Sequence, residues 1–328
     1  MCYEAGHGIT RDIARANAWY EKAAENGHIE ALSKLRSLKQ KSEEEQLVAL
    51  RKRAVVGVAS AQNQLGAVFE LKREDDEAFF WFKKAAEHQD VDGMYNFARM
   101  YHMGRGIEKN ERLAKEWYKK ASDKGHLKAA YDLAELYTFG ITSPKNKKAS
   151  ECAKIVIDEQ IEYGYSSNTN RNIGSEIRSK IDAYREKIRN QLRNSSYSSY
   201  SSSDDREAFS LYESLAAKGN ARAQSQLGVF YYTGKGTREN REEASKWWSK
   251  ASDLGNIAAK TYLGVMYIKG QGVVKDESKA IPLFQTAADL GDTHAMYNLA
   301  LLYAEGKGAS QNAQKATELL TQAIEYVH

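Results

Sequence analysis

The sequence predicts an all-α fold, a right-handed superhelical solenoid built from antiparallel helix pairs. The main observation is internal repetition: Gly219, Gly255 and Gly291 recur every 36 residues, each followed by Ala, Leu with a small neighbour, Tyr and Gly-x-Gly. Self-similarity at a fixed period of about 20–50 residues is typical of solenoids. The chain also has only two prolines among 328 residues. Proline interrupts helices, so this scarcity favours long uninterrupted ones.

The first helix of each unit, helix A, is predicted by its apolar spacing. Ala259, Leu263 and Tyr267 fall at i, i+4 and i+8, which places them on one stripe of a helix. The small residue after the Leu, such as Gly228 or Gly264, is expected to let a neighbouring backbone approach closely. The Gly-x-Gly that follows supplies the backbone freedom of a turn.

The second helix, helix B, is predicted to begin at an Asp or Asn four residues before an Ala. Side chains of this kind accept from the open N–H groups of a first helical turn, and Asn240 with Glu243 fits a capping box. An aromatic or leucine pair follows, such as Trp247 with Trp248. The helix then ends near a glycine suited to the left-handed conformation of a C-cap, such as Gly255.

We expect about eight helix pairs in three segments. Residues 1–163 carry N-terminal repeats, of which the first is truncated and the next two, 28–57 and 58–89, are shortened by loss of the Gly-x-Gly. Residues 164–203 hold a divergent long helix, with an apolar stripe that includes Ile177 and Ile181, and a flexible Ser/Tyr-rich loop. We interpret the long helix as helix A of a divergent repeat whose helix B is 204–218. Residues 204–328 carry the C-terminal repeats.

Composition and charge limit the function classes. A formal net charge of +4 gives no general basic surface for nucleic acid. No apolar run approaches the roughly 18 residues of a membrane-spanning helix. Cys2 and Cys152 lie far apart, so a disulfide is not expected and the redox compartment stays open. The chain opens inside a repeat, which suggests a truncated or processed N-terminus. The localisation therefore remains open between periplasmic or secreted and cytoplasmic, and we expect a monomer.

Catalytic and cofactor motifs are missing from the sequence. The seven histidines form no His-Glu-x-x-His pair and no zinc-ligand cluster with the cysteines. No serine lies in a Gly-x-Ser-x-Gly elbow. The Gly-x-Gly turns follow helices and lack the further residues of a phosphate-binding loop. We therefore expect no catalytic residue, metal site or cofactor.

Partner binding is the function that the repeat pattern favours. Helices A line the concave side of such a superhelix, where extended binding surfaces form. Residues near the repeat Ala but off the apolar stripe include amides and tyrosines, which suit hydrogen bonding to a peptide backbone and rigid contact area. These predicted binding residues, the A-face residues below, are Gln64, Tyr95, Asn96, Arg99, Tyr131, Asp132, Glu135, Gln226, Tyr262, Tyr297 and Asn298.

The repeat unit resembles the Sel1-like repeat, a relative of the tetratricopeptide repeat. Met266-Tyr267, Gly270-Gln-Gly272-Val273, Asp276 and Lys279-Ala280 carry the resemblance, together with Trp117-Tyr118 and Ala121. It implies a non-catalytic, bacterial protein–protein interaction scaffold that binds a protein or peptide, a toxin or a host protein among the candidates. One alternative is an immunity protein that neutralises a secreted lipase-type toxin. A remote alternative is a β-lactam or cell-wall-active enzyme, as in a cysteine-rich subgroup whose paired cysteines this chain lacks.

Overall fold

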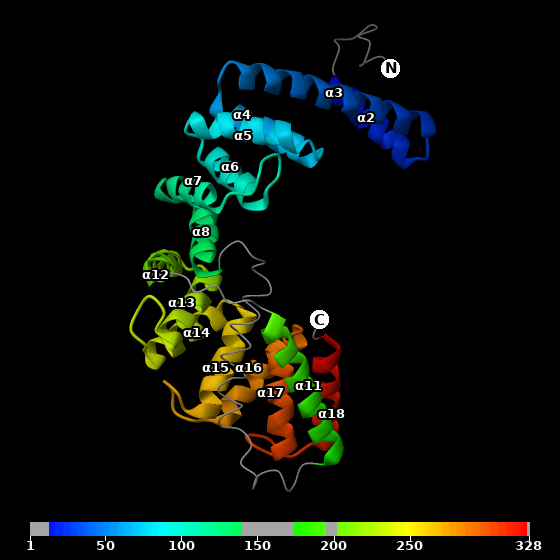
Figure 1. The fold of residues 1–328 in the computed structure, drawn as a ribbon. Coiled ribbons are helices and arrows are strands. Elements are labelled where there is room, and N and C mark those ends of the chain that lie inside the picture. Colours follow the sequence, from blue (N-terminus) through cyan, green and yellow to red (C-terminus); the bar gives the residue numbers. More distant parts are fainter. Residues whose placement is uncertain (1–12, 140–173, 195–201, 327–328) are drawn as a thin grey trace. The chain divides into compact units, whose positions relative to one another are not determined.

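The computed structural model confirms the all-α solenoid of helix pairs (Figure 1). It describes residues 13–139, 174–194 and 202–326, and these ranges contain helices and no strand. The helices are α2 (Ile13–Glu25), α3 (Ile29–Val55), α4 (Ala59–Leu71), α5 (Asp75–Glu87), α6 (Val91–Met103), α7 (Glu111–Asp123), α8 (Leu127–Phe139), α11 (Ser175–Asn194), α12 (Ser202–Ala217), α13 (Ala221–Thr233), α14 (Arg241–Asp253), α15 (Ile257–Lys269), α16 (Glu277–Asp289), α17 (Thr293–Glu305) and α18 (Ala313–Tyr326).

The chain divides into two compact units, an N-terminal unit Met1–Trp117 and a C-terminal unit Tyr118–His328. Helices A are α4 and α6 in the first unit and α8, α13, α15 and α17 in the second. In the C-terminal unit each of α13, α15 and α17 packs against the helix B of its own repeat and against the helix B before it. This alternation makes a continuous core, in which Trp248, Phe284 and Leu320 are completely buried. The three-segment division predicted from the sequence stays a prediction.

After α6, α13, α15 and α17, a Gly-x-Gly turn joins helix A to its helix B and also contacts the preceding repeat. Gly270 ends α15 in the left-handed conformation, with φ +69°, as a C-cap requires. Gly272 also has a positive φ, and a Cβ there would overlap the backbone carbonyl of Arg241, which begins the helix B before it. Gly106, Gly236 and Gly308 lie against the corresponding residues of their own neighbours. The second glycine is therefore an inter-repeat contact as well as a turn residue.

The small residue after the repeat Leu admits an aromatic ring, and not a backbone as the sequence suggested. A Cβ on Gly264 would lie 2.7 Å from the Phe284 ring, and one on Gly228 would overlap Trp248. Each ring comes from the helix B of the same repeat. In these two repeats the ring occupies the space that a Cβ would need. A glycine in helix A is therefore paired with a buried aromatic side chain in helix B.

Side-chain caps begin most of the repeat helices. Asn240 accepts from the Glu243 N–H and Asp276 accepts from the Ser278 and Lys279 N–H groups, as predicted for helix B. The capping box is only half formed, because the Asn240 N–H donates to the Tyr231 carbonyl and the Glu243 carboxylate pairs with Lys246. Helices A are capped in the same way by residues that the sequence analysis did not single out: Asp90, Asn220, Asn256 and Asp292.

Residues 28–57 are a single helix and not a shortened helix pair. Without a Gly-x-Gly to break it, α3 runs for 27 residues from Ile29 to Val55. Only Ala31 and Ala54 of this helix are buried. Residues 58–89 also lack the Gly-x-Gly, but they still divide into α4 and α5, with Arg73 at φ +65° in the turn. Loss of the turn glycines therefore gives one long, largely exposed helix only at 28–57.

The long helix α11 is not helix A of a divergent repeat, so that prediction is wrong. The helix B at 202–217, α12, packs against α8, and α11 packs against α18 at the other end of the C-terminal unit. The segment between α8 and α12 is therefore an insertion within one repeat. With this change and the loss at 28–57, six complete helix pairs lie in the described ranges.

A polar side chain one residue after the repeat Ala donates a hydrogen bond to a carbonyl near the end of the preceding helix. Gln62 Nε2 donates to the Ala54 carbonyl at 2.9 Å, Gln224 Nε2 to the Ala216 carbonyl at 3.1 Å, and Lys260 Nζ to the Ser252 carbonyl at 3.0 Å. Carbonyls in the last turn of a helix have no partner within the helix. Each of these carbonyls also accepts from the N–H of the glycine after the helix, Gly57, Gly219 or Gly255, so the side chain adds a second hydrogen bond at the helix end.

We expect Gln62→Leu to lower the free energy of unfolding by about 2 kcal/mol, since it removes two hydrogen bonds at a buried position. Besides the Ala54 carbonyl, Gln62 pairs through Oε1 with His88 Nδ1 at 2.7 Å. Urea unfolding monitored by circular dichroism measures the change. The matched control is Gln64→Leu, an exposed position two residues away in α4, for which we expect less than about 0.5 kcal/mol. Equal effects at both positions would contradict the capping role.

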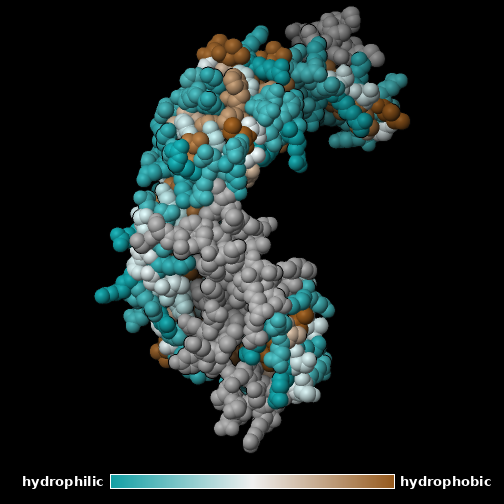
Figure 2. Space-filling model, viewed as in Figure 1, coloured by the Kyte–Doolittle hydropathy of each residue, from teal (hydrophilic) through white to brown (hydrophobic). Residues whose placement is uncertain are grey.

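The visible surface of the described residues is mainly hydrophilic, with small separate hydrophobic patches (Figure 2). Exposed apolar side chains include Leu71, Ile29 and Val274. None of the described helices is both long and apolar enough to cross a bilayer.

Candidate functional site

In the N-terminal unit the A-face residues lie on α4 and α6, and part of them is engaged within the unit. Gln64 is exposed and Tyr95 is half-buried. Asn96 Nδ2 donates to Asn63 Oδ1 at 2.8 Å. Arg99 forms an ion pair with Glu70, which also pairs with Arg105 at 2.7 Å. This cluster joins neighbouring repeats, so Arg99 is mainly an inter-repeat contact.

On α8 the three A-face residues Tyr131, Asp132 and Glu135 are half-buried. The Tyr131 ring meets the Tyr212 ring edge to face at 6.1 Å. Burial and then the charge of Glu135 raise the pKa of Tyr131 above its usual value. The phenol therefore stays protonated, and this part of the face carries the negative charges of Asp132 and Glu135.

In the C-terminal unit all four A-face residues are buried: Gln226, Tyr262, Tyr297 and Asn298. Asn298 Nδ2 donates to the His294 carbonyl in its own helix. Tyr297 is stacked on Tyr184 of α11, with ring centroids 4.6 Å apart and planes 15° apart. Tyr297 and Asn298 are therefore part of the internal packing. The sequence does not show this contact, because Tyr184 of α11 lies 110 positions before its partner His294.

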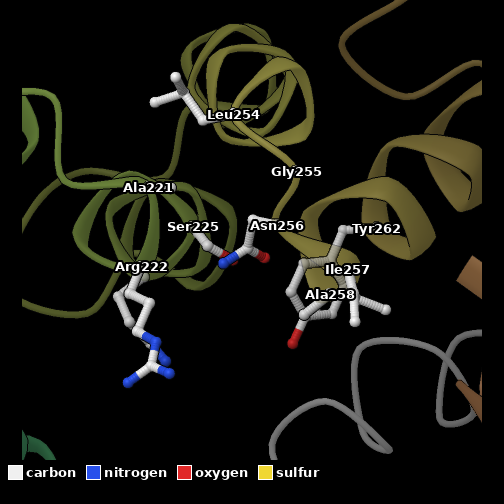
Figure 3. Close-up of a pocket in the computed structure, with 10 residues that line it drawn as sticks. Ala221, Arg222, Ser225, Leu254, Gly255, Asn256, Ile257, Ala258 and Tyr262 are labelled. Carbon is white, nitrogen blue, oxygen red and sulfur yellow. The ribbon is translucent and has the colours of Figure 1, made fainter. Parts of the chain in front are cut away.

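Gln226 and Tyr262 do come together at a pocket of about 420 Å³ between α13 and α15. Figure 3 shows Arg222 and Ser225 on α13, with Asn256, Ile257 and Tyr262 across from them on the α14–α15 turn and α15. Tyr262 is held against Trp248, with ring centroids 4.7 Å apart. Asn256 is fixed by accepting from the Ala259 N–H. The pocket walls are thus set by helix caps and core packing.

Gln226 supplies the unusual polar atom of this pocket. Its side chain is only 6% exposed, and its Oε1 has no hydrogen-bond partner among the described residues. A buried acceptor left unpaired costs about 1–3 kcal/mol. A rotation of the Gln226 amide toward the pocket would let this oxygen accept from a ligand N–H or O–H and recover that free energy. Arg222 is exposed at the edge of the pocket and adds a positive charge there.

Sequence reasoning selected Gln226 and Tyr262, placed Ser225 on the same helix face, and missed Arg222 and Asn256, which complete the pocket. The available signal was the Asn that precedes helix A at 220 and again at 256. Asn256 caps α15, and the turn that contains it lines the pocket together with the first turn of α13. Within the described ranges no group of three or more His, Cys, Asp or Glu residues could hold a metal ion.

Comparison with protein families matches the Sel1 repeat over residues 1–28, 59–90, 91–126, 127–151, 196–220, 221–256, 257–292 and 293–325. The unmatched stretch 29–58 corresponds to the single helix α3. The two short matches at 127–151 and 196–220 are the halves of the repeat that the insertion divides. No curated protein sequence matches the chain.

Solved structures of other repeat proteins are similar to the chain. A Sel1 repeat protein from Oxalobacter formigenes has a TM-score of 0.56 at 22% identity, covering 89% of this chain and 95% of that one. The protective antigen c5321 of uropathogenic Escherichia coli gives 0.34 at 23% identity, covering 98% and 74%. The immunity protein Pa5087 of Pseudomonas aeruginosa gives 0.36 at 16% identity, covering 82% of each chain. The first supports the fold, and the two scores below 0.5 support no further conclusion. With the Sel1 repeat matched over more than half of its length, the chain belongs to the Sel1 repeat family.

Proposed function

We propose that the chain is a non-catalytic scaffold that binds an extended segment of a partner protein on its helix A surface. The pocket between α13 and α15 is one point of attachment. The observation that carries this proposal is that Gln226 lines that pocket and that its buried Oε1 has no hydrogen-bond partner among the described residues.

The pocket has the size and polarity for a short peptide stretch. A volume of about 420 Å³ lies in the range of small ligand sites, which run from roughly 300 to 1,000 Å³. A backbone N–H of an extended peptide is the donor that Gln226 Oε1 lacks. The neighbouring Tyr262 ring offers a rigid wall for a side chain, and Arg222 favours an acidic residue at the edge.

Two groups of A-face residues outside this pocket serve as additional contacts in the proposal, each within its own unit. They are Gln64 and Tyr95 in the N-terminal unit, and Tyr131 with Asp132 and Glu135 on α8. Asn96, Arg99, Tyr297 and Asn298 have roles inside the fold, and the proposal no longer needs them to touch a partner.

The test selects binders from a displayed peptide library on the full chain and measures the affinity of the best ones. Replacing Gln226 by leucine removes the acceptor and leaves a peptide N–H unpaired, so we expect about tenfold weaker binding. The same change removes a buried orphan, so the unfolding free energy should stay equal or rise. Gln314→Leu, an exposed glutamine on α18, is the matched control.

Unchanged affinity in Gln226→Leu would assign the peptides to another surface and contradict the pocket. Failure to select any peptide that binds with micromolar affinity or better would contradict the scaffold proposal itself. The immunity and cell-wall-enzyme alternatives stay predictions. In the structure the described part of the insertion packs on the chain's own α18.

A further inference from the structure

Helix α11 packs against α18 in the position that a following helix A takes against the other helices B. Inside the C-terminal unit, each helix B packs against the helix A that follows it: α12 against α13, α14 against α15, and α16 against α17. The last helix B, α18, packs in the same manner against α11. Figure 1 shows α11 beside α17 and α18 at that end of the array. The end face of the array therefore accepts a helix, and the insertion supplies it.

The contact is built from one narrow apolar stripe and a polar edge. Ile177, Ile181 and Tyr184, spaced i, i+4 and i+7, are the buried residues among the described side chains of α11. The Tyr184 ring stacks on Tyr297 and its hydroxyl lies 2.8 Å from His294 Nδ1. Arg185 Nε donates to the Tyr297 hydroxyl at 2.9 Å, and Lys187 Nζ donates to the Ile324 carbonyl at 2.7 Å.

Helix α11 has fewer helix neighbours than the repeat helices have. Each of α13, α15 and α17 is held between two helices B, whereas α11 has one such neighbour, α18, in the described part of the chain. No helix pair of the described repeats needs α11 as a member, because α8 and α12 form their own pair. Amphipathic helices that bind in a groove of another protein also use anchors at i, i+4 and i+7.

We propose that the end face formed by α17 and α18 is a docking site for an amphipathic helix of a partner protein, and that α11 occupies it as an intramolecular competitor. The partner helix carries branched aliphatic anchors at positions 1 and 5, an aromatic anchor at position 8 and a basic residue at position 9, as α11 does with Ile177, Ile181, Tyr184 and Arg185. This site is separate from the pocket at Gln226 and does not depend on it.

Hydrogen–deuterium exchange on the full chain tests whether α11 opens by itself. The proposal requires the amides of α11 around Ile181 and Tyr184 to exchange through a local opening, on the order of tenfold or more faster than the amides of α15 and α17. Equal protection of α11 and α17 would make α11 a permanent part of the array and would overturn the proposal.

Binding of a labelled synthetic peptide of residues 174–194 to the full chain tests the surface. In Tyr184→Ala the built-in competitor is weakened, so the peptide should bind at least about tenfold more tightly than to the wild-type chain. Glu176→Ala, an exposed change on the same helix, is the matched control and should leave the peptide affinity at the wild-type value. Adding Tyr297→Ala to Tyr184→Ala should abolish the gain.

Peptide binding that is insensitive to Tyr297→Ala, or no gain in a folded Tyr184→Ala chain, would overturn the proposal. Dimerisation of the Tyr184→Ala chain at micromolar concentration, measured by light scattering, would assign the surface to a second copy and overturn it as well. If Tyr184→Ala does not fold, the exchange experiment on the wild-type chain decides.

Discussion

Replacing Gly272 by alanine is expected to lower the unfolding free energy of the C-terminal unit by about 3 kcal/mol. Two costs combine. Gly272 has φ +67°, where an L side chain costs about 1–2 kcal/mol. The new Cβ would also overlap the Arg241 carbonyl and the start of α14, and overpacking of this kind costs about 1–3 kcal/mol. The neighbour is backbone at a helix start, so the strain has no flexible side chain to relieve it.

Gly255→Ala separates the two costs. Gly255 has φ +83°, and a Cβ there would meet nothing within 4 Å. We therefore expect only the conformational cost of about 1–2 kcal/mol. Urea unfolding followed by circular dichroism gives both values, provided that two probes show the same transition. If Gly272→Ala costs no more than Gly255→Ala, the second glycine of the turn is not an inter-repeat contact.

The sequence predicted the fold well because each repeat carries its own local signals. The cap residues, the Gly-x-Gly turn and the i, i+4, i+8 stripe act within about 36 residues, and repetition multiplies the evidence. Loss of one signal had no predictable result. Residues 28–57 and 58–89 both lack the Gly-x-Gly, but the first forms the continuous helix α3 and the second forms the pair α4 and α5.

The candidate site was less predictable because it depends on contacts between distant segments. Tyr297 has the right spacing for a helix A binding residue, but Tyr184 covers it from an insertion far earlier in the chain. No local pattern records that partner. Gln226 and Tyr262 were predicted, but their shared pocket also depends on the turn at Asn256. Periodicity places a residue on a helix face and does not tell which other helix covers that face.

The same limit applies to paired aromatic residues. Trp247 and Trp248 look equivalent as a pair in the sequence, but Trp248 is completely buried and Trp247 is half-buried. Trp248 Nε1 donates to the Ser225 carbonyl at 3.0 Å, and its ring fills the space over Gly228. Trp247 instead carries Lys250 on its ring face, 4.1 Å from the ring centroid.

Trp248→Ala is therefore expected to cost about 4 kcal/mol of unfolding free energy, from lost apolar contact and the cavity left behind. For Trp247→Ala we expect about 1 kcal/mol or less, since that ring keeps contact with solvent. The two variants remove the same side chain from adjacent positions of α14, so composition and helix propensity are matched. Similar losses for both would contradict the assignment of Trp248 as the buried member of the pair.

A double-mutant cycle with Gly228→Ala tests the contact itself. In the wild-type chain, Gly228→Ala forces a Cβ into the Trp248 ring and should cost about 1–3 kcal/mol. In the Trp248→Ala background that ring is gone, and alanine is a better helix former than glycine by about 1 kcal/mol, so the same change should become neutral or stabilising. The coupling between the two positions is then about 2 kcal/mol or more, measured by urea unfolding of the four chains. Additive effects would contradict the idea that the glycine after the repeat Leu makes room for the ring. The recurrence of this glycine at Gly66, Gly228 and Gly264 would then need another physical reason.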